Sequence, residues 1–185
     1  MVKQILHDAE QRMNKAVEVV REEFVKIRTG KATTALLDGV KVDYYGAMTP
    51  LKQIANVSTP DAHTISVQPW EKGMIQPIEK AILNANLGLN PATDGTVIRV
   101  PIPPLNEERR RELVKLVKKF AEDGKIAVRN VRRDAIEHLK KTEKQGHISE
   151  DERKRAEQEA QKLTDRHVKD IDNLVALKEK EIMEV

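Results

Sequence analysis

The sequence contains no cysteine, which excludes a disulfide framework, a thiol nucleophile and a thiolate metal site. Aromatic residues make up only 3% of its 185 residues. No apolar run approaches the roughly 20 residues that a membrane-spanning helix needs. The N-terminus also lacks the apolar core of a secretory signal. We therefore expect a soluble, cytoplasmic protein that has no membrane partner.

Signatures of catalysis and of cofactor binding are missing as well. The sequence has no glycine-rich nucleotide-binding loop, no HExxH pair and no GxSxG nucleophile elbow. The five histidines show no metal-ligand spacing, and we expect each at the surface or at the edge of an apolar stripe: His7, His63, His138, His147 and His167. The sequence thus predicts a protein that is not an enzyme and has no catalytic residues, metal or cofactor.

Three segments carry the apolar periodicity of long helices. The first runs from Met1 to Gly30, with apolar residues every seven positions at Leu6, Met13, Val20 and Ile27. The second begins at the N-cap residue Asn106 and persists to about Lys144, and a capping box at Ser149 opens the third. Each helix has one apolar stripe, so the three can bury their stripes only against one another. Residues 1–30 and 106–185 are therefore predicted to form a three-helix bundle, and the chain to be a monomer.

The segment 31–105 has a different character, because it holds all eight prolines, both tyrosines and the tryptophan. A turn is expected at Thr59–Asp61. Alternating or β-rich runs predict four strands, and helical spacing predicts one helix between the third and the fourth strand: Val40–Tyr45, Leu51–Ser58, Thr64–Gln68, the helix Met74–Ala85, and Thr96–Ile102. The predicted fold is α+β with two domains, a long three-helix bundle carrying an inserted small α+β domain.

Two chain crossings join the insert to the bundle. They are predicted to form a two-strand hinge from these residues: Thr29, Gly30, Lys31, Pro103, Pro104 and Leu105. Glycine loosens the first crossing and the prolines stiffen the second. We expect motion between the two domains.

Charge is distributed unevenly, although the totals of 33 basic and 30 acidic residues nearly cancel. The insert carries 6 of each sign, residues 106–147 carry 13 basic and 8 acidic residues, and residues 148–185 carry 8 and 11. The second helix is therefore the basic element of the chain, and the third is acidic.

On a helical wheel centred on Val131, the basic residues of the second helix gather opposite or beside the buried stripe. They are Arg111, Lys115, Lys118, Lys125, Arg129, Arg132, Arg133 and Lys140, and only Glu122 and Glu143 share their sector. A solvated face laced with ion pairs would mix the two signs. The segregation favours binding to the phosphates of structured RNA.

Several motifs together resemble bacterial ribosome recycling factor. They are Arg28-Thr29-Gly30-Lys31, Val42-Asp43-Tyr44-Tyr45-Gly46, Leu87-Gly88-Leu89-Asn90-Pro91, Asp94-Gly95-Thr96-Val97-Ile98-Arg99, Glu107-Glu108-Arg109-Arg110 and Val128-Arg129-Asn130-Val131-Arg132-Arg133. The resemblance runs to Glu181-Ile182-Met183-Glu184 and so covers essentially the whole chain. Asn86, Asn106 and Lys31 depart from the commonest family pattern.

The resemblance implies an L-shaped translation factor, with the three-helix bundle as one arm and the insert, a small β/α/β sandwich domain, as the other. Family members split post-termination ribosomes into subunits together with elongation factor G and GTP, and their helical arm docks on large-subunit rRNA. The resemblance and the charge map together give these candidate rRNA-binding residues: Arg110, Lys118, Lys125, Arg129, Arg132 and Arg133.

Two other functions remain open from the residues alone. A coiled-coil scaffold or adaptor would use the stripe to contact another protein, and its affinity would depend only weakly on salt. An enzyme would need a cleft in the insert, around Asp43, Tyr44 or His63.

Overall fold

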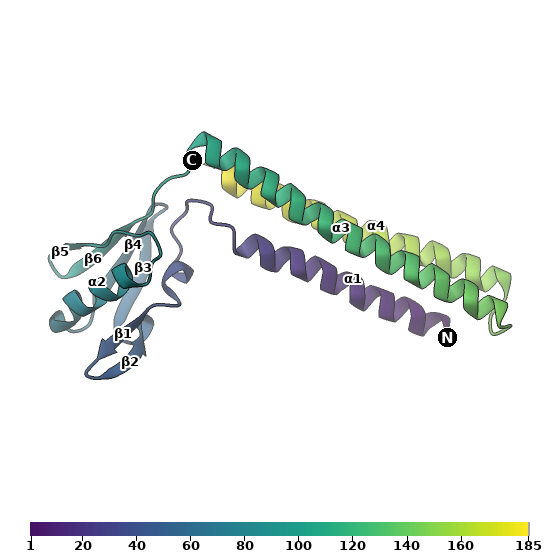
Figure 1. Cartoon of the computed structure of the whole chain (residues 1–185), viewed down its shortest axis with the longest axis horizontal. Helices are drawn as coiled ribbons and strands as arrows, with labels where there is room; N and C mark the ends of the chain where they lie inside the picture. The colour runs from purple at the N-terminus through teal and green to yellow at the C-terminus, as the bar shows by residue number, and fades with distance from the viewer. Residues whose placement is uncertain (185) are drawn as a thin grey trace. The chain divides into compact units, whose positions relative to one another are not determined.

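The computed structural model describes residues 1–184, which divide into two compact units (Figure 1). The helical unit contains Met1–Arg28 and the chain from Asn106 onward, and the insert is Thr29–Leu105. The first boundary lies two residues before the predicted one. Within residues 1–184, no helix is both long enough and apolar enough to cross a membrane.

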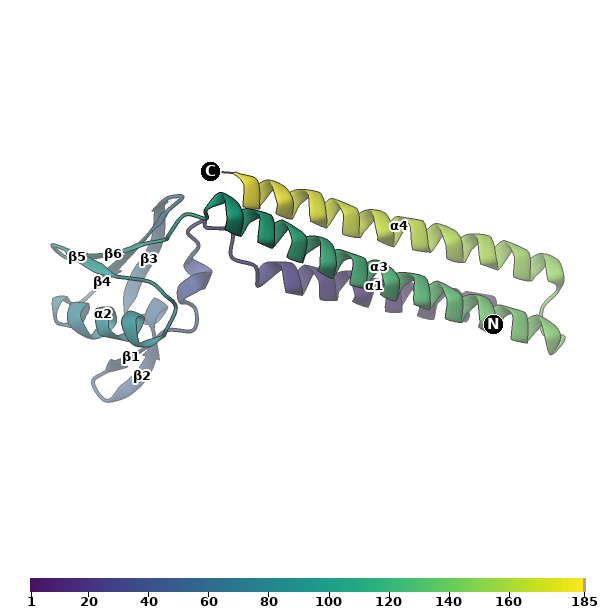
Figure 2. The same ribbon diagram turned by 45° about the horizontal axis from the view of Figure 1, so that its top comes forward.

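The helical unit consists of α1 (Val2–Val25), α3 (Glu107–Lys144) and α4 (Glu150–Met183). The three helices run side by side, and each contacts the other two (Figures 1 and 2). Its largest fully buried side chains are Met13, Leu139, His167, Ile171 and Ile182. The predicted three-helix arrangement is confirmed.

Side-chain caps fix the starts of α3 and α4 where they were predicted. Asn106 Oδ1 accepts a hydrogen bond from the backbone N–H of Arg109 at 2.7 Å. Ser149 Oγ accepts one from the N–H of Glu152 at 3.1 Å. Acidic residues in the first turn of each helix add a favourable interaction with the helix dipole.

The first helix is shorter than predicted and turns a slightly different face inward. It ends at Val25 rather than at Gly30, and the chain then leaves through a tighter turn in which Ile27 N–H donates to Phe24 O at 3.1 Å. The buried side chains follow steps of four, four, four, three and four through Ile5, Ala9, Met13, Val17, Val20 and Phe24. Leu6 is only half-buried, because a strict seven-residue spacing drifts around a helix of about 3.6 residues per turn.

His167 lies in the core of the helical unit, so its predicted place at the surface or stripe edge is wrong. Its side chain is 1% exposed. The ring Nδ1 donates to Leu163 O at 2.6 Å, and Nε2 lies 2.7 Å from Asn14 Oδ1 on α1. Burial is tolerated because both ring nitrogens have partners.

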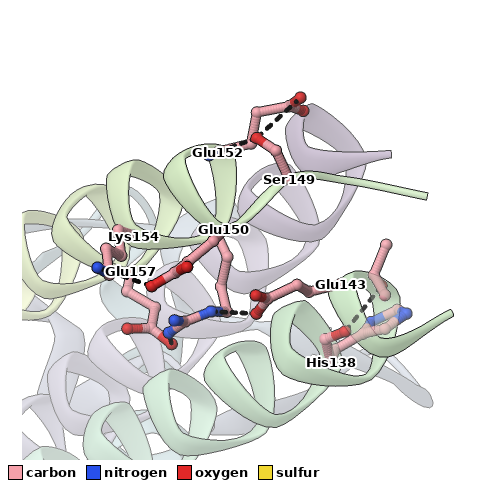
Figure 3. A network of polar contacts seen from close by, with 9 residues as sticks. His138, Glu143, Ser149, Glu150, Glu152, Lys154 and Glu157 are labelled. Carbon is pink, nitrogen blue, oxygen red and sulfur yellow. Dashed lines mark hydrogen bonds and ion pairs between the residues drawn. The ribbon is translucent and has the colours of Figure 1, made fainter. Parts of the chain in front are cut away.

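Ion pairs fasten α4 to α3 near the turn that connects them. Glu143 and Glu157, which are labelled in Figure 3, both form ion pairs with the guanidinium of Arg153. Arg153 Nη1 donates a hydrogen bond to Glu157 Oε1 at 3.0 Å, and this bond raises the pKa of Arg153 above its usual value. Lys154 pairs with Glu150 at 2.8 Å and thereby lowers the pKa of that carboxyl. The side chain of Arg153 is only 17% exposed, so its pairs are better shielded from solvent than most surface pairs.

The insert contains a hairpin, a four-stranded antiparallel sheet and one helix. The hairpin is β1 (Lys41–Tyr44) with β2 (Ala47–Pro50). The strands of the sheet are β3 (Ala55–Asp61), β4 (Thr64–Pro69), β5 (Ala92–Asp94) and β6 (Val97–Pro101), and the helix is α2 (Ile75–Asn84). The order of the strands in the sheet is β3-β4-β6-β5. The core lies among these elements and includes Ile65, Val67, Ile78, Ile82, Ile98 and Val100.

The structure corrects the predicted strands at four places. The predicted strand Leu51–Ser58 opens with a 3-10 turn over Leu51–Gln53 and becomes β3 only at Ala55. The predicted turn Thr59–Asp61 belongs to β3, and Pro60 is tolerated there because β3 is an edge strand. The strands β2 and β5 were not predicted.

Both crossings are attached to the turn between β3 and β4. Ala32 N–H donates to Ala62 O, and Ile102 N–H donates to His63 O, each at 2.7 Å. Gly30 has a φ of 75°, and a Cβ placed on it would lie 3.1 Å from Leu105 Cγ. The chain thus enters and leaves the insert at neighbouring points.

Candidate nucleic-acid interface

Three of the predicted rRNA-binding residues face α4. Lys125 forms an ion pair with Asp172, and its side chain is only 20% exposed. Arg132 donates to Gln161 Oε1 at 3.0 Å. Lys118 Nζ lies 4.0 Å from Glu179 Oε1. These contacts join α3 to α4. The acidic helix α4 supplies two carboxylates, those of Asp172 and Glu179, which pair with lysines of the basic helix α3.

The predicted outward sector was centred on the wrong residue, which explains this placement. The residues of α3 that are buried are Leu113, Val117, Ala121, Gly124, Val128, Val131, Ala135, Leu139 and Thr142. With an advance of about 100° per residue, the centre of this set lies about 40° from Val131. The whole sector therefore shifts away from α4, so Lys118, Lys125 and Arg132 move to the side of α3 that contacts α4.

A second set of α3 cations faces solvent. Within residues 1–184, Lys115, Arg133 and Lys140 are exposed and make no hydrogen bond or ion pair. Lys119 and Lys144 share these properties. The sequence reasoning missed these two, although a wheel centred on all apolar positions of the helix would have placed them outward. We call these five residues the outward row.

The remaining basic residues of the predicted stripe are partly engaged. Arg129 is exposed and donates to Glu122 Oε1 at 3.3 Å on the same helix. Arg111 pairs with Glu107 one turn earlier. Arg110 is half-buried and lies apart from the outward row, and among residues 1–184 its buried Nε has no hydrogen-bond partner. The flank of α3 that faces α1 is acidic at Asp134, which pairs with Arg12 at 3.0 Å.

The residues named for an enzymatic site in the insert are each engaged in a separate local bond. Asp43 Oδ1 accepts from Gly46 N–H at 2.8 Å, and Tyr44 OH donates to Glu71 at 2.6 Å. The backbone N–H of His63 donates to Asp61 at 2.8 Å and lowers the pKa of that carboxyl. Across residues 1–184 no group of three or more His, Asp or Glu side chains is arranged to hold a metal ion.

The sequence matches a protein-family model described as "Ribosome recycling factor" over residues 20–183. A ribosome-recycling factor of Legionella pneumophila (strain Paris) is 54% identical over 185 residues, which is 100% of both chains. One from Cupriavidus metallidurans is 61% identical over 176 residues, 95% of each chain. The similarity therefore extends over both units.

Solved structures agree with this assignment. A structure titled as the solution structure of the ribosome recycling factor matches with a TM-score of 0.75 and 47% identity, covering 100% of this chain and 98% of that one. A model of the T. thermophilus ribosome recycling factor, placed with elongation factor G of E. coli on a post-termination complex, matches with a TM-score of 0.62 and 46% identity over 100% of both chains. On its sequence and on its fold, this chain belongs to the ribosome recycling factor family.

Proposed function

We propose that this chain splits post-termination ribosomes into subunits together with elongation factor G and GTP. Its helical unit docks on large-subunit rRNA through α3. Family membership over the full length supports the recycling role. The T. thermophilus relative has been placed with elongation factor G on a post-termination complex, which supports the choice of partners.

The observation that carries the docking proposal is the outward row of α3. Its five cations have no acidic partner among residues 1–184, so their charges are available to phosphates. From Lys115 to Lys144 the row extends about 44 Å at a rise of about 1.5 Å per residue. A rigid rod with cations on one side fits the backbone of folded RNA without reading its bases.

The proposal assigns the two units different tasks. The helical unit binds phosphates, whereas the insert, with 6 basic and 6 acidic residues, serves as the part on which elongation factor G acts. GTP hydrolysis by that partner supplies the work, and this chain acts in the cytoplasm as a non-enzymatic monomer. The crossings at Gly30 and Pro103 form the hinge between the helical unit and the insert.

Cosedimentation with ribosomes over a salt series tests the docking. Replacing Arg133 by alanine is expected to weaken binding and to reduce the slope of log affinity against log salt by about 1. The matched control is Lys162→Ala, since Lys162 lies on α4 and already pairs with Glu159 at 3.4 Å. Arg132→Ala should reduce the slope less than Arg133→Ala, because Arg132 already binds Gln161. An affinity that hardly varies with salt would favour the scaffold alternative instead.

A splitting assay with elongation factor G and GTP tests the rest of the proposal. Deleting Pro103 should slow splitting more than it weakens ribosome binding, because the deletion alters the crossing and leaves the outward row intact. Equal losses of splitting and binding would count against the separate tasks of the two units.

A further inference from the structure

The tip of the β1–β2 hairpin places an aromatic residue where the backbone disfavours one. Tyr44 pairs with Ala47, so the loop consists of Tyr45 and Gly46. Their φ angles are 51° and 90°, both in the left-handed region. Two-residue loops of this kind strongly favour asparagine, aspartate or glycine at the first position. A bulky residue held there points to a use for its side chain.

The ring of Tyr45 is held in place and is still open to solvent. Tyr44 OH and Tyr45 OH donate to the two carboxylate oxygens of Glu71, at 2.6 and 2.7 Å. The two rings pack edge to face with centroids 4.6 Å apart. The half-buried Tyr44 already connects the hairpin to the segment after β4 through its hydrogen bond to Glu71. Tyr45 is therefore not needed to attach the hairpin to the rest of the insert. Tyr45 remains 79% exposed, which is the property that a binding surface requires.

The charges beside this ring indicate what it can bind. Within residues 1–184, neither Glu71 nor Asp43 forms an ion pair with a lysine or arginine. A carboxylate without a cation would repel the phosphates of RNA. The same carboxylate beside an aromatic face attracts a guanidinium, which stacks on the ring and donates hydrogen bonds to the oxygens.

We propose that the hairpin tip, defined by Tyr44, Tyr45 and Glu71, docks an arginine side chain of elongation factor G. This inference rests on the proposed function, and it gives a location on the insert for contact with that partner. Holding the ring in place before binding lowers the entropy lost on docking, as for tyrosines in other protein interfaces.

The variant Tyr45→Asn separates the docking role from the fold, because asparagine suits the left-handed loop position and removes the ring. We expect the concentration of elongation factor G that gives half-maximal splitting to rise about tenfold, as for loss of an interface hot spot. Ribosome binding without elongation factor G should not change. Tyr45→Phe keeps the ring and should lie between Tyr45→Asn and the native chain. Trp70→Ala is the matched control, since Trp70 is 66% exposed on the same unit and has no side-chain bond to Glu71.

The results separate this inference from the proposed function. Normal splitting by Tyr45→Asn would overturn the inference alone, as would an equal loss in Trp70→Ala or a loss of ribosome binding without elongation factor G. Failure of the native chain to split ribosomes would instead refute the proposed function. A photo-crosslinker at position 45 decides the inference in either case. An adduct with elongation factor G supports it, and adducts only with rRNA or ribosomal proteins overturn it.

Discussion

Replacing Gly124 by alanine should destabilise the helical unit, although glycine is a poor helix former. Gly124 lies in the middle of α3 and is buried against α1 and α4. A Cβ added there would overlap Cγ2 of Val20 and lie 3.3 Å from Cδ1 of Ile171. Val20 is 2% exposed and β-branched, so its methyl group has little freedom to move aside.

The expected free energy follows from two opposing effects. Alanine favours a helix interior over glycine by about 1 kcal/mol. Forcing an extra methyl group into a packed core costs about 1–3 kcal/mol. Gly124→Ala should therefore lower the free energy of unfolding by about 1 kcal/mol, or the Tm by about 2–4 °C in a chain of this size.

A double-mutant cycle with Val20→Ala tests this explanation directly. Val20→Ala removes the overlapping methyl group, and then Gly124→Ala should stabilise the unit by about 1 kcal/mol through helix propensity. Urea unfolding followed by far-ultraviolet circular dichroism, which reports mainly on the helices, measures all four proteins. If Gly124→Ala stabilises the native background, or if the two substitutions prove additive, the packing argument is refuted.

Three further predictions concern single polar groups and one glycine. Glu71→Gln should lower the pKa of Tyr44 and Tyr45, which the carboxylate raises, and near-ultraviolet absorbance during an alkaline titration reports these two alone because the chain has no other tyrosine. The folded chain binds the two tyrosine protons more tightly than the unfolded chain, so the stability of the insert should fall as the pH rises above 10.0. A tyrosine titration that is unchanged in Glu71→Gln would contradict both the pKa shift and this loss of stability. Asn106→Ala should cost about 1 kcal/mol of helical stability in urea unfolding, with Asn106→Asp near neutral as the control. Gly30→Ala should lower the free energy of unfolding by about 1–2 kcal/mol, because alanine disfavours a φ of 75°. The fluorescence of the single tryptophan reports unfolding of the insert, and an unchanged stability of this variant would contradict the predicted backbone strain.

The long helices could be predicted because their signals are local. Asn106 and Ser149 mark the starts of α3 and α4, and apolar residues recur along both helices. The strands β2 and β5 were not predicted because they are four and three residues long, and all three residues of Ala92–Asp94 are exposed. Such strands form because a neighbouring strand supplies hydrogen bonds, and a single stretch of sequence does not carry this information.

The candidate interface was harder to predict, because it depends on which face of α3 each neighbouring helix covers. Lys125 looks like any surface lysine until α4 brings Asp172 beside it. His167 was misplaced for a similar reason, since its burial depends on Asn14 on another helix. The prediction omits Lys119, although a wheel centred on Val131 also places it about 120° from the centre of the stripe.

The attachment of both crossings to one turn has a consequence for how the chain folds. To pack α1 against α3, the unfolded chain must close a loop of residues 31–104, at an entropic cost of roughly 4 kcal/mol beyond the constant term. Once the insert has folded, the contacts at Ala62 and His63 hold the two ends of this loop together. Folding of the insert therefore removes most of that cost, and the packing of α1 on α3 becomes kinetically a local event.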